Sequence, residues 1–468
     1  MHIYDSVKRA KVLFEPLKKR EARIYVCGPT VYDDAHLGHA RSALVFDLLR
    51  RVLVHLGYKV TFAKNFTDID DKIIKKMNES GKSLDEITSF YTKRYKDDMK
   101  AILVQDADIE PKATKSLKAI IDFTQNLLNN GYAYITSSGV YFDTSKDDKY
   151  LCISHRHVDE SDMCSRVDED EEKKNIKDFA LWKFAKKDDV SYPAPFGEGR
   201  PGWHIECSAM IKEHLADKSG KYQIDIHAGG MDLLFPHHEN EAAQTRKESS
   251  QELAKYWMHN GFVTVNGEKM SKSLGNSFFL KDVLKIYDGE IVRFYLLSTH
   301  YRANVNFNEI DLLQSKKRLD KIYRLKKRVL DVQSLPLPDK QFEDEIMLAL
   351  KDDLNISKAL SAIDAMITDA NDILDKNPKD NDKKAQIGAN IKLINSLLGA
   401  GEKEASDYFR LGVSEEEKAQ IETLIAKRLE ARKKKEFKEA DLIREELAQK
   451  GISLMDSADG TKWERVDI

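Results

Sequence analysis

The apolar positions between residues 44 and 56 recur at steps of three and four, which is the period of an amphipathic helix. The residues on this apolar face are Leu44, Val45, Leu48, Leu49, Val52, Leu53 and Leu56. Gly57 follows them and predicts the end of the helix. The stretches "RIYVC" (residues 23–27) and "YKVTFAKNF" (residues 58–66) flank this helix and predict strands. A strand, helix, strand unit of this kind predicts the opening of a parallel α/β nucleotide fold.

The pattern changes between about residue 110 and residue 200. "GYAYITSSGVYFDTS" predicts an antiparallel hairpin, and nine acidic side chains between Asp159 and Asp178 indicate a water-facing loop. We interpret this region as a module inserted into the α/β fold. After Gly199, the apolar and glycine-punctuated pattern returns in "YQIDIHAGGMDLLFPHHENE" and "NGFVTVNGEKMSKSLGN", which predicts the second half of that fold.

Long helical patterns with few prolines and glycines begin at about Asn308. A last helix ends at Gly451, and a small hairpin with its turn near Asp459 and Gly460 follows. The predicted fold class is therefore α/β, a Rossmann-like parallel-sheet domain with an inserted module, followed by an all-α helical bundle and a small C-terminal helix-plus-hairpin module. The predicted boundaries are 1–110 and 199–307 for the two halves of the nucleotide fold, 111–198 for the insert, 308–400 for the bundle and 401–468 for the C-terminal module.

The 468 residues exceed the size at which one hydrophobic core usually stops growing, which is consistent with several domains. The 76 basic and 79 acidic side chains nearly cancel to a net charge of -3, so any surface for nucleic acid has to be local. The first residues lack the apolar core of a signal peptide and no apolar run reaches the length of a membrane span, so we expect a cytoplasmic protein without membrane contact. The four cysteines, Cys27, Cys152, Cys164 and Cys207, are sparse, which favours a reducing compartment over a disulfide framework.

Two imidazoles stand at the start of the first predicted helix. In "HLGH", His36 and His39 are three residues apart and share one helical face, while Gly38 leaves room for a flat base or sugar. Unpaired backbone N–H groups and the helix dipole attract anions at such a position, so the motif points to a phosphate group. Histidines at a helix start are also common as ordinary caps, and the motif alone leaves that alternative open.

A second segment carries two ammonium groups. "EKMSKSLGN" places Lys269 and Lys272 in a loop that is rich in serine and glycine and has little apolar content. Two lysines on such a loop suit closure over a triphosphate as pyrophosphate leaves. A solvated basic turn is the alternative, and the nucleotide-type helix start upstream favours the triphosphate.

Four side chains are of the kinds that bind zinc. His237 and Glu241 stand at i and i+4 of "HHENE", so a helix presents both on one face. Cys27 ends the first predicted strand, and Cys207 follows "GWHIE". Because these residues are far apart in the chain, spacing alone does not establish one site, and buried cysteines with a surface acid are the alternative. His238 is a rival to His237 as a ligand.

"HLGH" and "KMSKS" resemble the two signatures of the class I aminoacyl-tRNA synthetases. The first motif has leucine, Leu37, in place of the usual isoleucine. "YVCGPTVYDDAHLGHARS", "NFTDIDDKI", "GRPGWHIECSAM", "FPHHENE" and "YWMHNGFV" resemble the cysteinyl-tRNA synthetases in particular, and the likeness runs from about residue 20 to the C-terminus. The resemblance implies ATP-dependent ligation of L-cysteine to tRNA(Cys) through a cysteinyl-adenylate. It further implies one Zn²⁺ per chain, Mg²⁺ with the ATP substrate, and a C-terminal module that binds the anticodon; we expect a monomer.

The resemblance also implies roles for individual side chains. The catalytic residues are His36, His39, Lys269 and Lys272; the nucleotide-binding residues are Gly38, Gly229, Gly230 and Lys272; the residues of the cysteine pocket are Thr67, Trp203 and Asp232; and the zinc ligands are Cys27, Cys207, His237 and Glu241. Zinc binds a thiolate strongly and a serine hydroxyl poorly, so the metal separates two nearly isosteric substrates, and we predict no editing domain. Without the resemblance, Trp203 is more readily interpreted as a core residue.

Two basic stretches are the predicted contacts with tRNA. Lys316 to Arg328 contains eight basic side chains, and Lys427 to Lys438 contains seven. Lysine and arginine along a helix can follow tRNA phosphates, and an aromatic residue such as Trp463 can stack on an unpaired anticodon base. The alternatives are two solvated helix faces and a tryptophan that only pins the terminal hairpin.

Three rival functions use some of the same features. A ligase that joins cysteine to an amino sugar shares the adenylate chemistry but has no use for residues 400–468. A non-catalytic RNA-binding protein has no need of intact "HLGH" and "KMSKS". A zinc hydrolase activates water on the metal and turns over without ATP.

Overall fold

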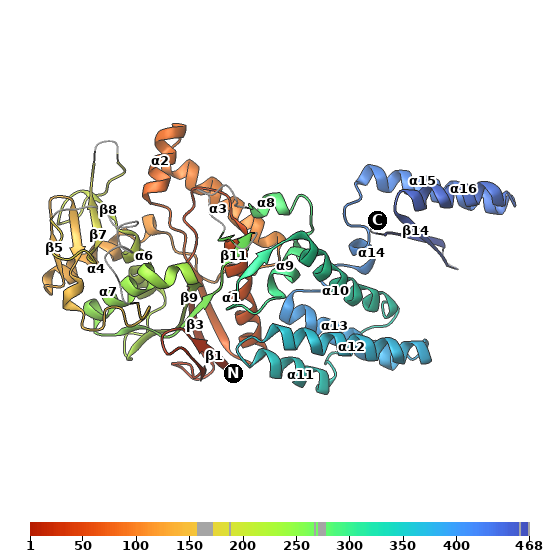
Figure 1. Ribbon diagram of the computed structural model, residues 1–468, viewed down its shortest axis with the longest axis horizontal. Coiled ribbons are helices and arrows are strands. Elements are labelled where there is room, and N and C mark those ends of the chain that lie inside the picture. Colours follow the sequence, from red (N-terminus) through yellow and green to blue (C-terminus); the bar gives the residue numbers. More distant parts are fainter. Residues whose placement is uncertain (157–171, 187–188, 266–267, 270–277, 458–459, 467–468) are drawn as a thin grey trace.

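The computed structural model describes residues 1–156, 172–186, 189–265, 268–269, 278–457 and 460–466 (Figure 1). Its N-terminal half is an α/β unit and its C-terminal half is helical, with a separate small module at the end of the chain (Figure 1, blue). The predicted fold class is thus confirmed. Across the described residues, no helix is long and apolar enough to cross a membrane, and Cys27, Cys152 and Cys207 are free thiols.

A parallel sheet lies at the centre of the α/β unit, in the order β10 (Glu252–Asn260), β9 (Tyr222–Gly230), β3 (Glu21–Val26), β4 (Lys59–Lys64). Helix α1 (Leu37–His55) connects β3 to β4, as the hydrophobic pattern predicts. From β3 the chain continues outward to β4, whereas β9 pairs with the opposite edge of β3. Ligands of open α/β sheets bind at the carboxyl ends of the strands where the order reverses in this way. That point lies between Cys27 and the end of β9.

The periodic face of α1 packs into the main hydrophobic core, where Leu44, Leu49, Val52 and Leu53 are each fully buried. Gly57 adopts a left-handed conformation, with φ of 82°, at the end of the helix. This position therefore has the glycine that the turn requires. The start of the same helix lies beneath the carboxyl end of the sheet.

The chain between β4 and β9 contains the predicted insert. This part of the chain forms α2 (Asp71–Ser80), α3 (Leu84–Ala101), α4 (Leu117–Asn129) and α6 (Trp203–His214), with 3-10 turns η1 (Ala113–Lys115) and η2 (Thr144–Lys146). Of these, η1, α4 and η2 fall within the bounds predicted for the insert. Its antiparallel sheet has the order β5 (Ala133–Ile135), β6 (Gly139–Phe142), β7 (Phe179–Phe184), β8 (Gly199–Pro201), so the predicted hairpin is confirmed. Most of the predicted acidic loop, residues 157–171, lies outside the described residues.

The second half of the α/β unit adds η3 (Met231–Leu233), η4 (Leu234–His238) and α7 (Glu239–Ser249) between β9 and β10. A small sheet of β12 (Glu268–Lys269), β11 (Val263–Val265) and β13 (Val305–Phe307) follows, with α8 (Leu280–Val283) and α9 (Gly289–Leu297). A hairpin of β1 (His2–Asp5) and β2 (Ala10–Leu13) precedes the unit. Lys269 lies in β12, opposite Thr264 of β11. Lys272 lies outside the described residues.

The helical half consists of α10 (Glu309–Arg328), α11 (Lys340–Leu350), α12 (Ile356–Lys376) and α13 (Asn381–Leu398). A short α14 (Ala405–Tyr408) leads into the C-terminal module, which contains α15 (Glu415–Lys433), α16 (Phe437–Gln449) and the hairpin of β14 (Ile452–Ser457) and β15 (Gly460–Arg465). Gly451, with φ of 74°, ends α16 as predicted. The C-terminal module has its own small core.

Trp463 is the centre of that small core. Its side chain is 1% exposed, and its indole Nε1–H donates to Glu422 at 2.6 Å. The guanidinium of Arg410 lies over the ring at 4.4 Å. The prediction that Trp463 can stack on an anticodon base is therefore wrong, because the ring already packs inside the module and pins the hairpin to α15.

Several basic side chains of the predicted tRNA contact along α10 bind acidic or backbone groups of this chain. The side chains engaged in this way are Lys316 with Asp320, Arg318 with Asp364, Lys326 with backbone carbonyls of residues 401–403, Lys327 with Glu464, and Arg328 with Asp375. Charge density in a sequence does not distinguish a phosphate contact from an intramolecular ion pair. Lys317, Lys321 and Arg324 of the same helix are exposed, so the contact between α10 and tRNA stays a prediction.

Candidate active site

The four predicted zinc ligands come together at the carboxyl ends of β3 and β9. One donor atom from each of Cys27, Cys207, His237 and Glu241 lies within 4.8 Å of the other three. Cys27 follows β3 directly, and its backbone N–H extends the sheet by donating to the Ala228 carbonyl at 3.1 Å. Cys207 lies in α6, His237 in η4 and Glu241 in α7. Residues that are distant in the chain thus share one point in space.

The electrostatics of this cluster favour a thiolate on one of its two cysteines. The Cys27 thiol donates to the Cys207 sulfur at 3.8 Å, and chiefly this contact lowers the pKa of Cys207 to about 6. Burial acts to lower the pKa of His237, but the charge of Glu241 overrides it and raises that pKa to about 10. A thiolate is the form of cysteine that binds a metal.

Four further histidines surround the cluster, and of these the sequence analysis singled out His238 alone. His227 Nε2 lies 2.9 Å from Glu241 Oε2, and His204 Nδ1 lies 3.0 Å from His237 Nδ1. His238 Nε2 lies 3.4 Å from the Cys27 sulfur, and its Nδ1 lies 2.8 Å from His259 Nε2. The only sequence signal for His227 and His259 is that each is a histidine in a mostly buried strand.

These histidines create a second set of possible ligands. Donor atoms of Cys27, His227, His238 and Glu241 also lie within 4.8 Å of one another. The two sets share Cys27 and Glu241 and differ in the other two members. Both His237 and His238 thus lie close enough to Cys27 and Glu241 to be ligands, which are the two alternatives that the sequence allows.

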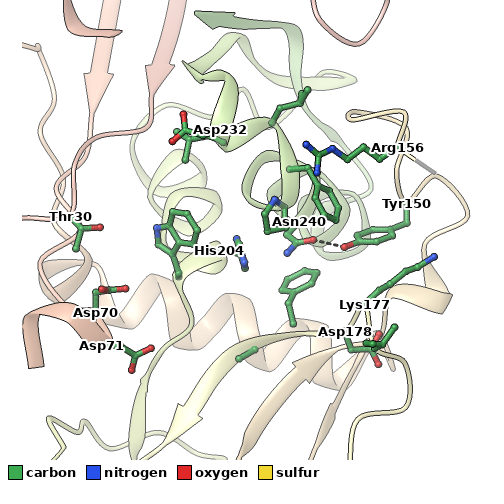
Figure 2. Close-up of a pocket in the computed structure, with 18 of the residues that line it drawn as sticks. Thr30, Asp70, Asp71, Tyr150, Arg156, Lys177, Asp178, His204, Asp232 and Asn240 are labelled. Atoms are coloured by element: carbon green, nitrogen blue, oxygen red, sulfur yellow. Dashed lines mark hydrogen bonds between the residues drawn. The ribbon is translucent and has the colours of Figure 1, made fainter. Parts of the chain in front are cut away.

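A cavity of about 860 Å³ opens beside the cluster, between the sheet and the insert. Trp203 and Asp232 line it, and the indole of Trp203 stacks on the His237 imidazole with ring centroids 4.3 Å apart. Trp203 is 38% exposed, so it belongs to the wall of the cavity rather than to the core. Figure 2 shows Thr30, Asp70 and Asp71 on one side of this cavity and Tyr150, Arg156, Lys177 and Asp178 on the other, with His204 between them.

Thr67, the third residue of the predicted cysteine pocket, lies behind this wall. Its side chain is 2% exposed, and its carbonyl accepts from Val31 N at 3.1 Å, which ties it to the segment containing Thr30. Its hydroxyl donates to Glu206 Oε2 at 2.9 Å. Burial raises the pKa of Glu206 well above its ordinary value. Glu206 is a further buried polar residue that the sequence analysis did not single out.

The two histidines of "HLGH" form the N-terminal cap of α1. The Nδ1 atom of His36 accepts from the backbone N–H of Gly38 and of His39, and the Nδ1 atom of His39 accepts from the backbone N–H of His36. The rings stack with centroids 3.7 Å apart. Because both Nδ1 atoms act as acceptors, each neutral ring carries its proton on Nε2.

The sequence predicts unpaired backbone N–H groups at the start of α1, but three of these groups have acceptors in the structure. Leu37 N donates to the Phe278 carbonyl at 3.1 Å, and the amides of Gly38 and His39 donate to the His36 ring. These three helix-start donors are satisfied within the protein, so a phosphate has to be bound by side chains. The capping and anion-binding interpretations of these histidines are thus compatible.

The segment after "KMSKSLGN" is attached to the same helix start. Leu280 N donates to the Ala35 carbonyl at 2.7 Å, and Phe279 forms an antiparallel bridge with His36. The described residues that directly follow the second motif in the sequence are therefore paired with the start of the helix that carries "HLGH".

The three predicted nucleotide-binding glycines have close protein neighbours. A Cβ atom at Gly38 would lie 2.8 Å from Cε1 of His36, and one at Gly229 would lie 2.8 Å from Cδ1 of Leu233. A Cβ atom at Gly230 would collide with the Asp232 carboxylate. In each case the absent side chain makes room for another residue of the site.

The overall architecture is shared with solved synthetases. A Mycobacterium tuberculosis methionyl-tRNA synthetase in complex with methionyl-adenylate matches with a TM-score of 0.60 at 14% sequence identity, over 85% of this chain and 94% of the other. At this identity the match shows a shared fold, and the class I synthetase catalytic domain itself is shown by the family model that matches residues 13–317.

Comparison of the sequences identifies the family within that class. Residues 13–317 match the tRNA synthetases class I (C) catalytic domain, and residues 414–463 match the cysteinyl-tRNA ligase anticodon binding domain. Cysteine–tRNA ligases of a Nitratiruptor species and of Aliarcobacter butzleri are 65% and 61% identical to the chain, over 100% of it and over 100% and 99% of their own lengths. The chain belongs to the cysteine–tRNA ligase family and is an enzyme.

Proposed function

We propose that this enzyme ligates L-cysteine to tRNA(Cys) through a cysteinyl-adenylate, and that a zinc ion held by the chain selects the substrate thiol. The convergence of two sulfurs, one imidazole and one carboxylate beside the cavity carries this proposal. We further propose that the enzyme acts as a cytoplasmic monomer, and that the domain boundaries follow those expected from the sequence.

The residues present fit a zinc ion. Cys27, Cys207, His237 and Glu241 supply two sulfurs, a nitrogen and an oxygen, which is a ligand set typical of zinc. Bound zinc supplies a Lewis acid that accepts a thiolate as a further ligand and discriminates against a hydroxyl. The stacked indole of Trp203 fixes the plane of the His237 ring, and His204 contacts the other nitrogen of that ring.

The amino group of the substrate is assigned to Asp232, and Thr67 is assigned a positioning role next to it. The Asp232 carboxylate lines the cavity and matches an ammonium group in charge. The buried Thr67 hydroxyl donates to Glu206 Oε2 at 2.9 Å and accepts from Asn65 Nδ2 at 3.4 Å, so it fixes these two side chains behind the cavity wall.

The chain's own residues then stabilise adenylate formation. The substrate carboxylate attacks the α-phosphorus of ATP in line, the bond to the bridging oxygen breaks, and pyrophosphate leaves with Mg²⁺. The Nε2–H donors of His36 and His39 stabilise negative charge on the phosphoryl group, as do the ammonium groups of Lys269 and Lys272. The terminal ribose hydroxyl of tRNA then attacks the activated carbonyl and AMP leaves. Gly38, Gly229 and Gly230 maintain the space that this nucleotide site requires.

The tRNA partner is assigned to the C-terminal module. Arg428 and Arg432 both bind Asp456, whereas Lys433, Lys435 and Lys438 are exposed on the same stretch. The exposed lysines suit contact with tRNA phosphates. Residues 400–468 therefore favour tRNA over an amino sugar as the acceptor of cysteine.

Two assays on one preparation test the function. We expect cysteine-dependent ATP–pyrophosphate exchange that serine does not support, with about one zinc per chain by metal analysis. Exchange without charging of purified tRNA would favour the amino-sugar ligase. Absence of exchange would favour an RNA-binding protein, and ATP-independent hydrolysis would favour a zinc hydrolase.

A further inference from the structure

Polar contacts, linked through one turn of α10 and one turn of α9, connect the C-terminal module to the helix that carries "HLGH". This series of contacts starts where the Lys327 ammonium of α10 binds the Glu464 carboxylate of β15 and lies 3.1 Å from the Met455 sulfur of β14. One turn earlier on α10, the hydroxyl of the fully buried Tyr323 donates to Glu290 Oε2 of α9 at 2.6 Å. Helix α10 thus contacts the C-terminal hairpin and the catalytic half within one turn.

The second part of the series runs from α9 into α1. Arg293 stands one turn after Glu290, and its guanidinium donates to Asp47 Oδ2 of α1 at 2.6 Å. Arg51 of α1 binds the same carboxylate oxygen at 2.7 Å. Both arginines are largely or fully buried, and their charges hold the pKa of Asp47 below its ordinary value although burial acts to raise it.

The same residues bind the segment that leads to the C-terminal module, residues 396–404. Arg293 Nε donates to the Leu398 carbonyl at 2.6 Å, and Arg51 donates to the Ser396 carbonyl at 3.3 Å. Gly399, with φ of 65°, follows directly, and a Cβ atom there would lie 2.6 Å from the Arg293 Nε. The glycine therefore permits the guanidinium to approach the end of α13.

Glu290 and Tyr323 bind the next part of this segment. Glu290 Oε1 accepts from Gly401 N at 2.5 Å, and the Tyr323 hydroxyl accepts from Lys403 N at 3.0 Å. The chain between the bundle and the C-terminal module is thus held on both sides by residues of α1, α9 and α10. The residues that hold this segment thus include Arg293, which also binds Asp47 of α1.

We propose that Tyr323, Glu290, Arg293 and Asp47 are positioning residues that couple tRNA binding at the C-terminal module to the placement of the "HLGH" histidines. This inference rests on the proposed function. The cost of an incorrect anticodon then appears in the rate of charging as well as in affinity. Coupling predicts an anticodon penalty that depends on the Tyr323 hydroxyl, which a matched pair of single variants measures.

A matched pair of variants provides the test. The rings of Tyr323 and Tyr408 stack with centroids 3.7 Å apart, and both are buried. The Tyr408 hydroxyl donates to Asp320 of α10 at 2.6 Å, whereas the Tyr323 hydroxyl donates to Glu290. Tyr323→Phe and Tyr408→Phe each remove one buried hydroxyl from the same pair of stacked rings. Only Tyr323→Phe removes the hydrogen bond to Glu290 of α9, which is part of the connection to α1.

The measurements are cysteine-dependent exchange, and kcat and KM for charging of tRNA with its normal anticodon and with one altered anticodon base. For Tyr323→Phe we expect exchange within about twofold of the wild type, a fall of about fivefold in kcat for normal tRNA, and an anticodon penalty in kcat that shrinks by a similar factor. Tyr408→Phe should match the wild type in all of these. If Tyr323→Phe folds poorly, Lys327→Met replaces it in the test, because this position is partly exposed. We expect the same changes in exchange, kcat and anticodon penalty for Lys327→Met.

The proposal is overturned if both tyrosine variants behave alike, or if Tyr323→Phe lowers exchange and charging by one common factor with an unchanged anticodon penalty. A wild type that charges tRNA but shows no anticodon penalty in kcat would overturn the coupling and leave the proposed function intact. A wild type without cysteine-dependent exchange would overturn the proposed function, and the coupling with it.

Discussion

The imidazole of His237 and the carboxylate of Glu241 lie one helical turn apart, with Nε2 2.9 Å from Oε1 and neither side chain more than 1% exposed. Two sulfurs lie beside these groups, so the four ligands of the proposed zinc ion are already close together in the protein. Loss of any one ligand is therefore expected to affect metal and substrate together.

Cys207→Ser is expected to lower the zinc content and to raise the KM for cysteine in the exchange assay by about 100-fold or more, because the thiolate ligand is removed. Metal analysis and exchange kinetics on the same sample measure both effects. Cys152→Ser is the matched control, since Cys152 is a free thiol outside the cluster. An unchanged zinc content in Cys207→Ser would remove this residue from the ligand set.

His39→Ala is expected to slow adenylate formation by about 100-fold and to leave tRNA affinity nearly unchanged, because the lost Nε2–H donor acts on the phosphoryl group. Exchange kinetics and tRNA binding separate the two effects. If tRNA affinity falls steeply instead, the histidine contacts tRNA and not ATP.

His36→Asn separates the capping role of the first histidine from its chemical role. Asparagine is a favourable N-cap, so thermal stability should stay near that of the wild type, whereas His36→Ala should lose about 1 kcal/mol. Exchange should fall by a similar large factor in both variants. Exchange at wild-type rate in His36→Asn would show that this imidazole only caps the helix.

Asp98→Asn is expected to stabilise the protein at pH 7 and to have little effect near pH 4. Burial, with the nearby charge of Asp34, raises the pKa of Asp98 to about 6, and its Oδ2 accepts no hydrogen bond from any described residue. The folded state then binds more protons than the unfolded state between about pH 4 and pH 6, so stability falls as pH rises through that window. Because the group is only half buried, we expect a gain of about 1 kcal/mol at pH 7.

Thermal melts of Asp98→Asn and wild type from pH 4 to pH 8 measure this gain as a widening difference in Tm. Asp97→Asn is the control, since Asp97 is exposed and pairs with Lys93. A Tm difference that does not vary with pH would contradict the assigned pKa.

Trp463→Ala is expected to destabilise the C-terminal module by about 3–5 kcal/mol, because it leaves a cavity in a small core and an unpaired Glu422. tRNA charging should fall sharply, while exchange should persist because the catalytic half has its own core. Limited proteolysis measures unfolding of the module. Equal loss of exchange and charging would show that the two halves do not fold independently.

Lys433→Ala combined with Lys438→Ala is expected to weaken tRNA binding and to reduce the slope of log K against log salt by about 1 to 2. Binding at several salt concentrations gives that slope. Lys418→Ala is the control, because this lysine lies on α15 and pairs with Glu415. An unchanged slope would place the phosphate contacts elsewhere.

Local patterns in the sequence predict much of this structure. The steps of three and four in residues 44–56 identify α1, and the chemistry of His237 and Glu241 at i and i+4 anticipates their contact. Both signals depend on neighbours within one or two turns. Neither requires knowledge of the rest of the chain.

Contacts between distant residues were not predictable in the same way. His227 reaches Glu241 only because β9 pairs beside β3, and Trp463 is buried only because the terminal hairpin folds onto α15. The basic residues of α10 look alike in sequence, yet their ion-pair partners lie on other elements. Such outcomes depend on tertiary packing, which periodicity and composition do not encode.

The position of Cys27 directly after β3 has a consequence for biosynthesis. Its closest companions in the donor cluster come from α6, η4 and α7, which the ribosome makes about 180 to 210 residues later. A nascent chain that ends within the insert holds only one of the two sulfurs of this cluster, that of Cys27, and no pocket around it. All four donors are present only after α7 has been synthesised, so the complete cluster requires strands from both separated parts of the sheet.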